Sequence, residues 1–172
     1  MGETLNASVV LLSGGHDSAN LLREEISMGA RACALFVDYG QPAAVRELCA
    51  AVSVCDRFAV DLHRVTLPEL PRDGDVYLAR NMLLIGQGTA LAMQLRFNRV
   101  LIGCHDGDNA RFPDCTAAFI KHMDAAARRA YGVRIIAPMR QRSSYIVPGT
   151  WSCYEGGAKP CGKCMSCQQP NT

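Results

Sequence analysis

The sequence lacks any long hydrophobic run, and its N-terminal apolar stretch ASVVLL is far too short to span a bilayer. No basic segment precedes that stretch, so we expect no signal peptide. Blocks of like charge are also missing, and the net charge is only +2. Such a weak, scattered charge disfavours a nucleic-acid-binding surface or a polybasic membrane anchor. These absences predict a cytoplasmic globular protein that binds neither membranes nor nucleic acid directly.

A disulfide framework is not expected either, because the nine cysteines are odd in number and no signal peptide is predicted. Near the C-terminus, Cys153, Cys161, Cys164 and Cys167 form the spacing C-x7-C-x2-C-x2-C. Short C-x2-C turns direct two thiolates at one tetrahedral cation, and neighbouring glycines supply the tight turns. A closed set of four thiolates leaves no open coordination position, so we expect a structural zinc ion. Free thiols on a flexible tail are the alternative.

Apolar periodicity divides the rest of the chain into alternating strands and helices. Strands are expected at 7–12, 32–38, 59–67, 99–104 and 133–138, helices at 18–28, 42–58, 80–96 and 116–132, and a loop at 67–75. This alternation, with few hairpin signals, is typical of a parallel sheet covered on both faces. We therefore predict an α/β fold with a parallel five-stranded sheet over residues 1–140, followed by a zinc-binding segment over residues 141–172.

The stretch SGGHDS, residues 13–18, falls where such a sheet binds ligands, between the first strand and the first helix. Gly14 and Gly15 would let backbone amides approach phosphate oxygens, while Ser13 and Ser18 add hydroxyl donors at the positive end of the helix. The loop does not end in Gly-Lys-Ser/Thr, so transfer of a γ-phosphoryl group is not indicated. A phosphate site and a plain glycine-rich turn that caps the helix both fit these residues.

This strand–SGGxDS–helix pattern resembles the pyrophosphate loop of the ATP pyrophosphatases. The motifs FVDYGQ (36–41), ARN (79–81), FPDC (112–115) and WSCYEGGAKPCGKCMSC (151–167) follow in the order of the 7-cyano-7-deazaguanine (preQ0) synthase family. The resemblance implies a Rossmann-like fold of the adenine nucleotide alpha hydrolase type. It also implies an ATP-dependent ligase of queuosine biosynthesis, which converts 7-carboxy-7-deazaguanine and ammonia to an amide and then a nitrile, releasing AMP and pyrophosphate.

The resemblance assigns ATP binding to two segments. The expected ATP-binding residues are Leu12, Ser13, Gly14, Gly15, His16, Asp17 and Ser18, together with Phe36, Asp38 and Gln41. Ser13, Asp17 and Ser18 are also expected to act in catalysis. Asp17 would bind a Mg²⁺ ion that bridges phosphates, or else complement the helix dipole. Asp38 would accept hydrogen bonds from the ligand, or else cap its own strand end.

Two later motifs are expected to bind the deazaguanine substrate. The expected residues are Arg80, Asn81, Asp108, Phe112, Pro113 and Asp114. Arg80 suits the α-phosphate or the substrate carboxylate and would act in catalysis, with an interhelical salt bridge as the alternative. Asp114 would grip the N–H and amino group of the base while Phe112 stacks on its ring, unless Phe112 only packs in the core. Asp108 would assist at the metal or phosphates, or else be a solvated loop acid.

Some positions depart from the family pattern. His16 replaces an apolar residue and is expected to face solvent, with a proton donor beside the phosphates as the alternative. Arg111 adds a charge near the expected base pocket, and the usual lysine-containing helix is missing between Pro138 and Trp151. Trp151 is expected to pack the zinc segment onto the body rather than to line the base pocket.

These departures describe a shortened member, such as a phage or a defence cassette carries. Two rival functions stay open beside the synthase. One is an offshoot that stops at the amide or joins the carboxylate to another amine, and the other is a non-catalytic nucleotide-binding module. By the same resemblance we expect a homodimer.

Overall fold

The computed structural model describes residues 6–74, 76–104, 112–138, 145 and 147–168. The main strands are β1 (Ala7–Leu11), β2 (Arg31–Asp38), β3 (Leu62–Thr66), β6 (Arg99–Leu101) and β7 (Arg134–Ile136). The main helices are α1 (His16–Ser27), α2 (Ala44–Phe58), α3 (Arg80–Leu95) and α4 (Ala117–Tyr131). Shorter elements are β4 (Arg72–Asp73), β5 (Val76–Tyr77), the 3-10 turn η2 (Pro113–Cys115) and α5 (Met165–Gln168).

The five main strands lie in the order β3-β2-β1-β6-β7, and every pairing between them is parallel. The chain winds outward from β1 to β3, then crosses to the other side of β1 to add β6 and β7. The winding direction therefore reverses between β1 and β6. At such a reversal, parallel sheets leave a crevice at the carboxyl ends of the strands where ligands bind.

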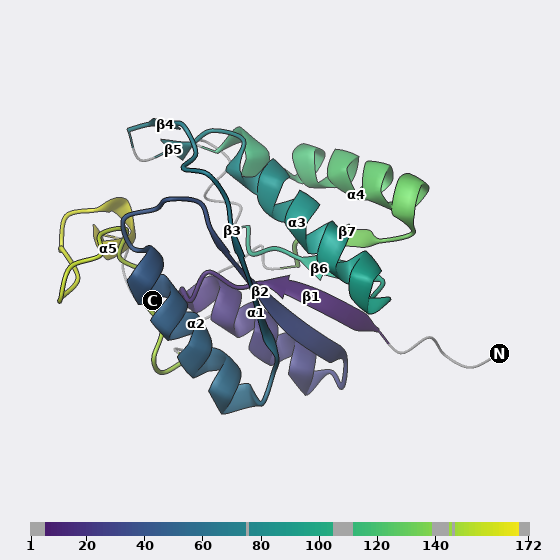
Figure 1. The fold of residues 1–172 in the computed structure, drawn as a ribbon, viewed down its shortest axis with the longest axis horizontal. Helices are drawn as coiled ribbons and strands as arrows, with labels where there is room; N and C mark the ends of the chain where they lie inside the picture. The colour runs from purple at the N-terminus through teal and green to yellow at the C-terminus, as the bar shows by residue number, and fades with distance from the viewer. Residues whose placement is uncertain (1–5, 75, 105–111, 139–144, 146, 169–172) are drawn as a thin grey trace.

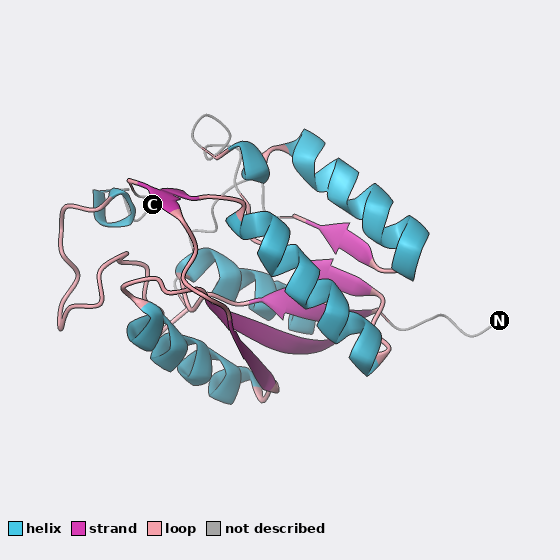
Figure 2. Ribbon diagram, turned by 45° about the horizontal axis from the view of Figure 1, so that its top comes forward, coloured by secondary structure: helices cyan, strands magenta, loops and turns pink. Residues whose placement is uncertain are grey.

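Helices cover both faces of this sheet, as Figure 2 shows. Val9 and Leu11 of β1 belong to the core that includes residues of α3 and α4, whereas Val10 and Leu12 belong to the core that includes residues of α1 and α2. Successive strand residues point to opposite faces, so one short apolar strand supplies both cores. The predicted α/β fold with a five-stranded parallel sheet is confirmed.

The edge of the sheet opposite the crevice contains a buried polar cluster. Glu25 of α1 is 1% exposed and accepts a hydrogen bond from the Ser8 hydroxyl at 2.6 Å. Arg99 forms an ion pair with the same carboxylate and donates to the Ser8 oxygen at 3.0 Å. The cluster ties α1, β1 and β6 together at the amino ends of the strands.

Residues 67–75, predicted as a loop, contain half of a short antiparallel hairpin, β4–β5. The prediction missed it because strands of two residues are too short to show an alternating pattern. Tyr77 of the hairpin meets Tyr39 edge to face, with ring centroids 5.0 Å apart. This contact brings the hairpin to the carboxyl end of β2, beside the crevice. None of the described helices has the length and apolarity needed to cross a bilayer.

Candidate functional site

Gly14 lies in the loop between β1 and α1 and has a φ of +82°, a backbone conformation that favours glycine. A Cβ atom at this position would lie only 2.4 Å from the backbone oxygen of Glu47 and 3.0 Å from the Cβ of Ala50. Gly14 is therefore required for close packing of the loop against α2, whatever ligand the loop holds.

Gly15 differs, because it caps α1 in an extended conformation and lacks a side-chain capping bond. A Cβ at Gly15 would meet the Ser13 hydroxyl oxygen at 3.5 Å, the Ser152 hydroxyl oxygen at 3.6 Å and the Trp151 carbonyl oxygen at 3.7 Å. These are ordinary contact distances, so the fold itself tolerates a side chain here. The missing side chain instead keeps the N-terminus of α1 open, which suits an anion.

The two loop serines lie side by side, since the Ser13 and Ser18 oxygens are 3.2 Å apart. The Ser18 hydroxyl donates to the Gly15 carbonyl at 3.1 Å, which makes Ser13 the donor between the two serines. Asp17 follows at the first turn of α1, and a Cβ placed on Gly103 would lie 3.9 Å from the Asp17 Cβ. Because Gly103 lies two residues after the end of β6, Asp17 is at the crevice between β1 and β6.

His16 is half-buried and its Nδ1 lies 2.8 Å from the Thr150 hydroxyl oxygen. The Thr150 hydroxyl donates its one proton to the Val147 carbonyl at 3.0 Å, so it accepts from Nδ1–H of His16. The predicted solvent-facing histidine is therefore tied to the C-terminal segment, with the other ring nitrogen, Nε2, left as the acceptor of the neutral ring.

The polar side chains at the end of β2 and just after it form hydrogen bonds with other groups of the protein. The Gln41 side chain accepts from the Tyr39 N–H at 2.8 Å and donates to the Glu47 carboxylate at 2.9 Å. Asp38 accepts from the Gly40 N–H at 3.2 Å, which matches the capping alternative. These bonds shape the segment that borders the loop.

Two residues of the expected ATP set have side chains in the core. Phe36 and Leu12 are each 1% exposed and pack among residues of α1 and α2. Only their backbones remain for a ligand, because a core side chain has no surface to offer. An apolar residue beside a motif is as easily explained by packing, and the sequence pattern does not separate the two roles.

Glu47 lies against the loop, and neither Glu47 nor Tyr39 is among the residues expected to bind ATP. Burial raises the pKa of the Glu47 carboxyl above its ordinary value, against the opposing effects of the Gln41 hydrogen bond and of Arg80. Burial also raises the pKa of Tyr39, while Arg80 opposes the rise. Polar and charged groups thus interact from Glu47 of α2 to Arg80, the first residue of α3, and no spacing in the sequence indicates these interactions.

The expected substrate residues at the start of α3 and in η2 do come together. The Asp114 carboxylate accepts from the backbone N–H of Asn81 at 3.0 Å, and the Asn81 amide donates to the Asp114 carbonyl at 3.1 Å. The Arg80 guanidinium lies 6.0 Å from the centre of the Phe112 ring and donates to the Asn81 side chain at 3.2 Å. Asn81 is 3% exposed, and its bonds to Asp114 join the start of α3 to η2. Pro113, at the start of η2, is exposed.

Within this group, Arg80 keeps its charge. Burial lowers its pKa, but Tyr39, Cys115 and Asp114 outweigh that effect and the pKa is raised. A half-buried cation beside an aromatic ring is suited to a planar anion. Asp108 and Arg111 lie outside the described residues.

The four clustered cysteines converge on one point. The Sγ atoms of Cys153, Cys161, Cys164 and Cys167 all lie within 4.8 Å of one another. A zinc ion with Zn–S bonds of about 2.3 Å would separate tetrahedral sulfurs by about 3.8 Å, and the Cys164 and Cys153 sulfurs are 4.0 Å apart. Hydrogen bonds from the backbone N–H groups of Lys163 and Cys164 lower the pKa of the Cys161 thiol to about 7. The donor set fits zinc, and the cluster can hold it.

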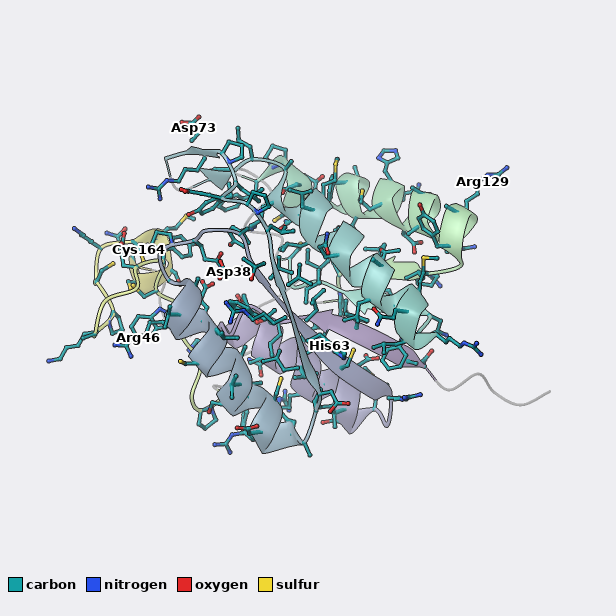
Figure 3. All side chains as sticks on the ribbon, viewed as in Figure 1. Asp38, Arg46, His63, Asp73, Arg129 and Cys164 are labelled. Carbon is teal, nitrogen blue, oxygen red and sulfur yellow. The ribbon has the colours of Figure 1, made fainter. Side chains whose placement is uncertain are left out.

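The segment that bears these cysteines packs on α2. The Arg46 guanidinium lies 5.4 Å from the centre of the Trp151 ring and donates to the Gly157 carbonyl at 3.1 Å. A Cβ at Gly156 would lie 2.3 Å from the Pro42 oxygen, so the approach requires glycine. Figure 3 shows Arg46 on α2 beside the segment that contains Cys164. Trp151 therefore packs the segment onto the body, as predicted.

Fold and cysteine cluster together define the class: a Rossmann-like α/β protein with a C-terminal site that can hold a metal ion. The family model for the queuosine biosynthesis protein QueC matches residues 7–76 and 74–171. The chain belongs to the QueC family.

Two relatives carry the name 7-cyano-7-deazaguanine synthase. The 7-cyano-7-deazaguanine synthase of Pseudoalteromonas translucida is 32% identical over 197 aligned positions, covering 94% of this chain and 90% of the relative. The enzyme of the same name from Marinobacter nauticus is 33% identical, covering 92% of this chain and 88% of the relative. Because the first alignment is longer than the 172-residue chain, the relative contains segments that this chain lacks.

One solved structure supports the fold. It is the predicted subunit of tRNA methyltransferase from Methanocaldococcus jannaschii, with a TM-score of 0.50 and 12% identity, covering 81% of this chain and 70% of that chain. At this identity the likeness shows the fold alone.

Proposed function

We propose that the protein is an ATP-dependent ligase that converts 7-carboxy-7-deazaguanine and ammonia to 7-cyano-7-deazaguanine, with release of AMP and pyrophosphate. One observation carries the proposal. The open α1 N-terminus at Gly15 lies at the sheet reversal, in a chain that aligns over 94% of its length with a 7-cyano-7-deazaguanine synthase.

A carboxylate resists attack by ammonia because it is negatively charged and lacks a good leaving group. Attack of its oxygen on the α-phosphorus of ATP expels pyrophosphate and leaves an acyl adenylate. Ammonia then forms the C–N bond, AMP leaves, and one proton is lost. A second adenylation, now on the amide oxygen, expels a second pyrophosphate. AMP then leaves with that oxygen, and the amide nitrogen loses its two protons to give the nitrile.

The described residues suit the separate parts of this reaction. The backbone and hydroxyl groups of Ser13, Gly15 and Ser18 would hold the pyrophosphate at the positive end of α1. Asp17 would hold a Mg²⁺ ion on the phosphates, since carboxylate oxygens are its usual ligands. Arg80 would pair with the α-phosphate or the substrate carboxylate through its planar fork. Zinc in the cysteine cluster would be structural, because four thiolates close its coordination shell.

For substrate recognition, Asp114 would accept from the N–H and amino group of the base, and Phe112 would lie against its face. One carboxylate oxygen of Asp114 already accepts from Asn81, and each carboxylate oxygen has two lone pairs. The Asn81 bond therefore leaves acceptor positions for a base and orients the carboxylate.

The test is incubation of the purified protein with ATP, ammonium and 7-carboxy-7-deazaguanine, with nucleotides and bases identified by mass. We expect AMP, pyrophosphate and the nitrile. Gly15→Val should abolish turnover, whereas Gly86→Val, on an open stretch of α3 with no atom within 4 Å, should retain it. ADP as the nucleotide product would refute the assignment.

A second candidate is an offshoot that stops at the amide or joins the activated carboxylate to another amine. The segments that the relative has and this chain lacks favour it. The same incubation separates the candidates, because an amide product without nitrile while ATP is still in excess would select the offshoot.

A further inference from the structure

Ser152 lies beside the phosphate loop, although it comes from the opposite end of the chain. Its hydroxyl oxygen accepts from the backbone N–H of His16, the first residue of α1, at 3.4 Å. The same oxygen is 3.6 Å from where a Cβ of Gly15 would be. The Ser13 oxygen lies 3.5 Å from that point, so two hydroxyl groups flank the space left by the missing side chain.

The Ser152 hydroxyl makes fewer hydrogen bonds than it could. At 3.4 Å the bond from His16 is longer than the usual range of about 2.7–3.2 Å for N–H···O hydrogen bonds. Among the described residues, no acceptor is found for the hydroxyl proton of Ser152, although the residue is half-buried. A phosphate oxygen between Ser13 and Ser152 would accept that proton and could take the His16 N–H as well.

The position of Ser152 is fixed on both sides. The backbone N–H of the preceding residue, Trp151, donates to the Gly14 carbonyl at 2.9 Å. The following residue, Cys153, is 3% exposed and belongs to the four-cysteine cluster, and its carbonyl accepts from the Trp151 ring N–H at 2.8 Å. Thr150 adds the bond to His16. The cysteine segment therefore places one particular hydroxyl at the loop.

We propose that Ser152 is a further phosphate-binding residue of the ATP site, and that the four-cysteine segment positions it there. This inference rests on the proposed function, and it extends the pyrophosphate site beyond the Ser13–Ser18 loop. The C-terminal segment then contributes a group to the ATP site in addition to stabilising the fold.

Calorimetric titration with inorganic pyrophosphate and, separately, with adenosine tests the proposal. The variants are Ser152→Ala and a matched control, Ser27→Ala, which removes a hydroxyl bonded to the Arg23 carbonyl at the other end of α1. Zinc content and melting temperature are measured for each. Hydrogen bonds to charged groups are stronger than those between neutral groups. We therefore expect Ser152→Ala to lower the pyrophosphate affinity by about tenfold or more. Adenosine affinity should be unchanged, and Ser27→Ala should bind both probes like the wild type.

Equal pyrophosphate affinity in Ser152→Ala and the wild type would overturn the inference and leave the proposed function standing. Parallel loss of adenosine affinity, or loss of zinc, would assign Ser152 to folding and also overturn it. A wild-type protein that binds neither pyrophosphate nor adenosine would refute the proposed function itself.

Discussion

The carboxylate of Asp114 accepts a hydrogen bond from the backbone N–H of Asn81, which joins η2 to the first turn of α3. That N–H is among the first of its helix and has no partner within the helix. Asp114 therefore has a structural contact in addition to its proposed role in base recognition, and the two can be separated by the choice of substitution.

We expect Asp114→Asn to weaken deazaguanine binding by about a hundredfold or more. The amide oxygen of asparagine can still accept from Asn81, but its NH₂ group would face the donors of the base, and the charge that strengthens both bonds is lost. Hydrogen bonds to charged groups are worth about 1.5–3 kcal/mol, and an unpaired buried donor costs about 1–3 more. Calorimetric titration should show the loss for the base and almost none for ATP.

Asp114→Ala is the matched comparison, because it removes the bond to Asn81 as well. We expect it to lower the free energy of unfolding by about 1 kcal/mol, a typical value for one hydrogen bond at a helix N-terminus. Urea unfolding of both variants measures this difference. Unchanged base affinity in both would place recognition elsewhere.

The two loop glycines should respond differently to alanine. Gly14→Ala forces a Cβ into the Glu47 carbonyl and keeps a positive φ, so we expect a loss of at least about 1–2 kcal/mol in the free energy of unfolding. Gly15→Ala should unfold like the wild type but bind ATP more weakly, since the methyl group occupies the expected phosphate space. Urea unfolding and ATP titration on the same samples measure the two effects. A Gly15→Ala variant that is less stable than the wild type would contradict the assignment of Gly15 to ligand binding.

The cysteine cluster should hold one zinc ion per chain. Cys164→Ser removes one of its four thiolates, so we expect lost zinc and a lower melting temperature before any change in kinetic constants. Cys49→Ser is the control, because Cys49 is exposed and outside the cluster. Metal analysis that finds well under one zinc per wild-type chain would exclude this role.

Glu47 should make stability depend on pH. Burial raises the pKa of its carboxyl above the ordinary 4.5, so the folded state holds the proton more tightly than the unfolded state. The associated stability is present below the ordinary pKa and is lost as the pH rises through the folded value. The free energy of unfolding of the wild type, measured relative to Glu47→Gln, should therefore fall as the pH rises from the ordinary pKa of the carboxyl through its raised, folded-state pKa. Urea unfolding of both proteins at several pH values measures the difference, and a difference independent of pH would contradict the prediction.

The buried pair of Glu25 and Arg99 provides a last stability test. Glu25→Ala leaves the Arg99 cation without its partner, and breaking such a pair costs about 3–5 kcal/mol. Glu24→Ala removes an exposed carboxylate from the same helix and should cost less than about 1 kcal/mol. Equal losses in urea unfolding would contradict the difference in burial.

The sequence by itself determined the features that depend on near neighbours in the chain. Alternating apolar runs gave the parallel sheet with helices on both faces, because strands and helices each have their own period. The spacing of Cys161, Cys164 and Cys167 brought three thiolates within reach of one ion. The order of SGGHDS after a strand placed the loop at the ligand-binding edge of the sheet.

Only the tertiary structure decided what each of these groups touches. Gly14 is required by a carbonyl of α2, Asp114 is bonded to α3, and the Ser152 hydroxyl meets a backbone N–H 136 residues away. Hydrogen-bond partners at such separations leave no periodicity or spacing in the sequence. They form because the sheet reversal brings the carboxyl ends of β1, β2 and β6 to one crevice, and the cysteine segment packs at the same end of the sheet, against the loop after β1 and the start of α2 (Figure 1).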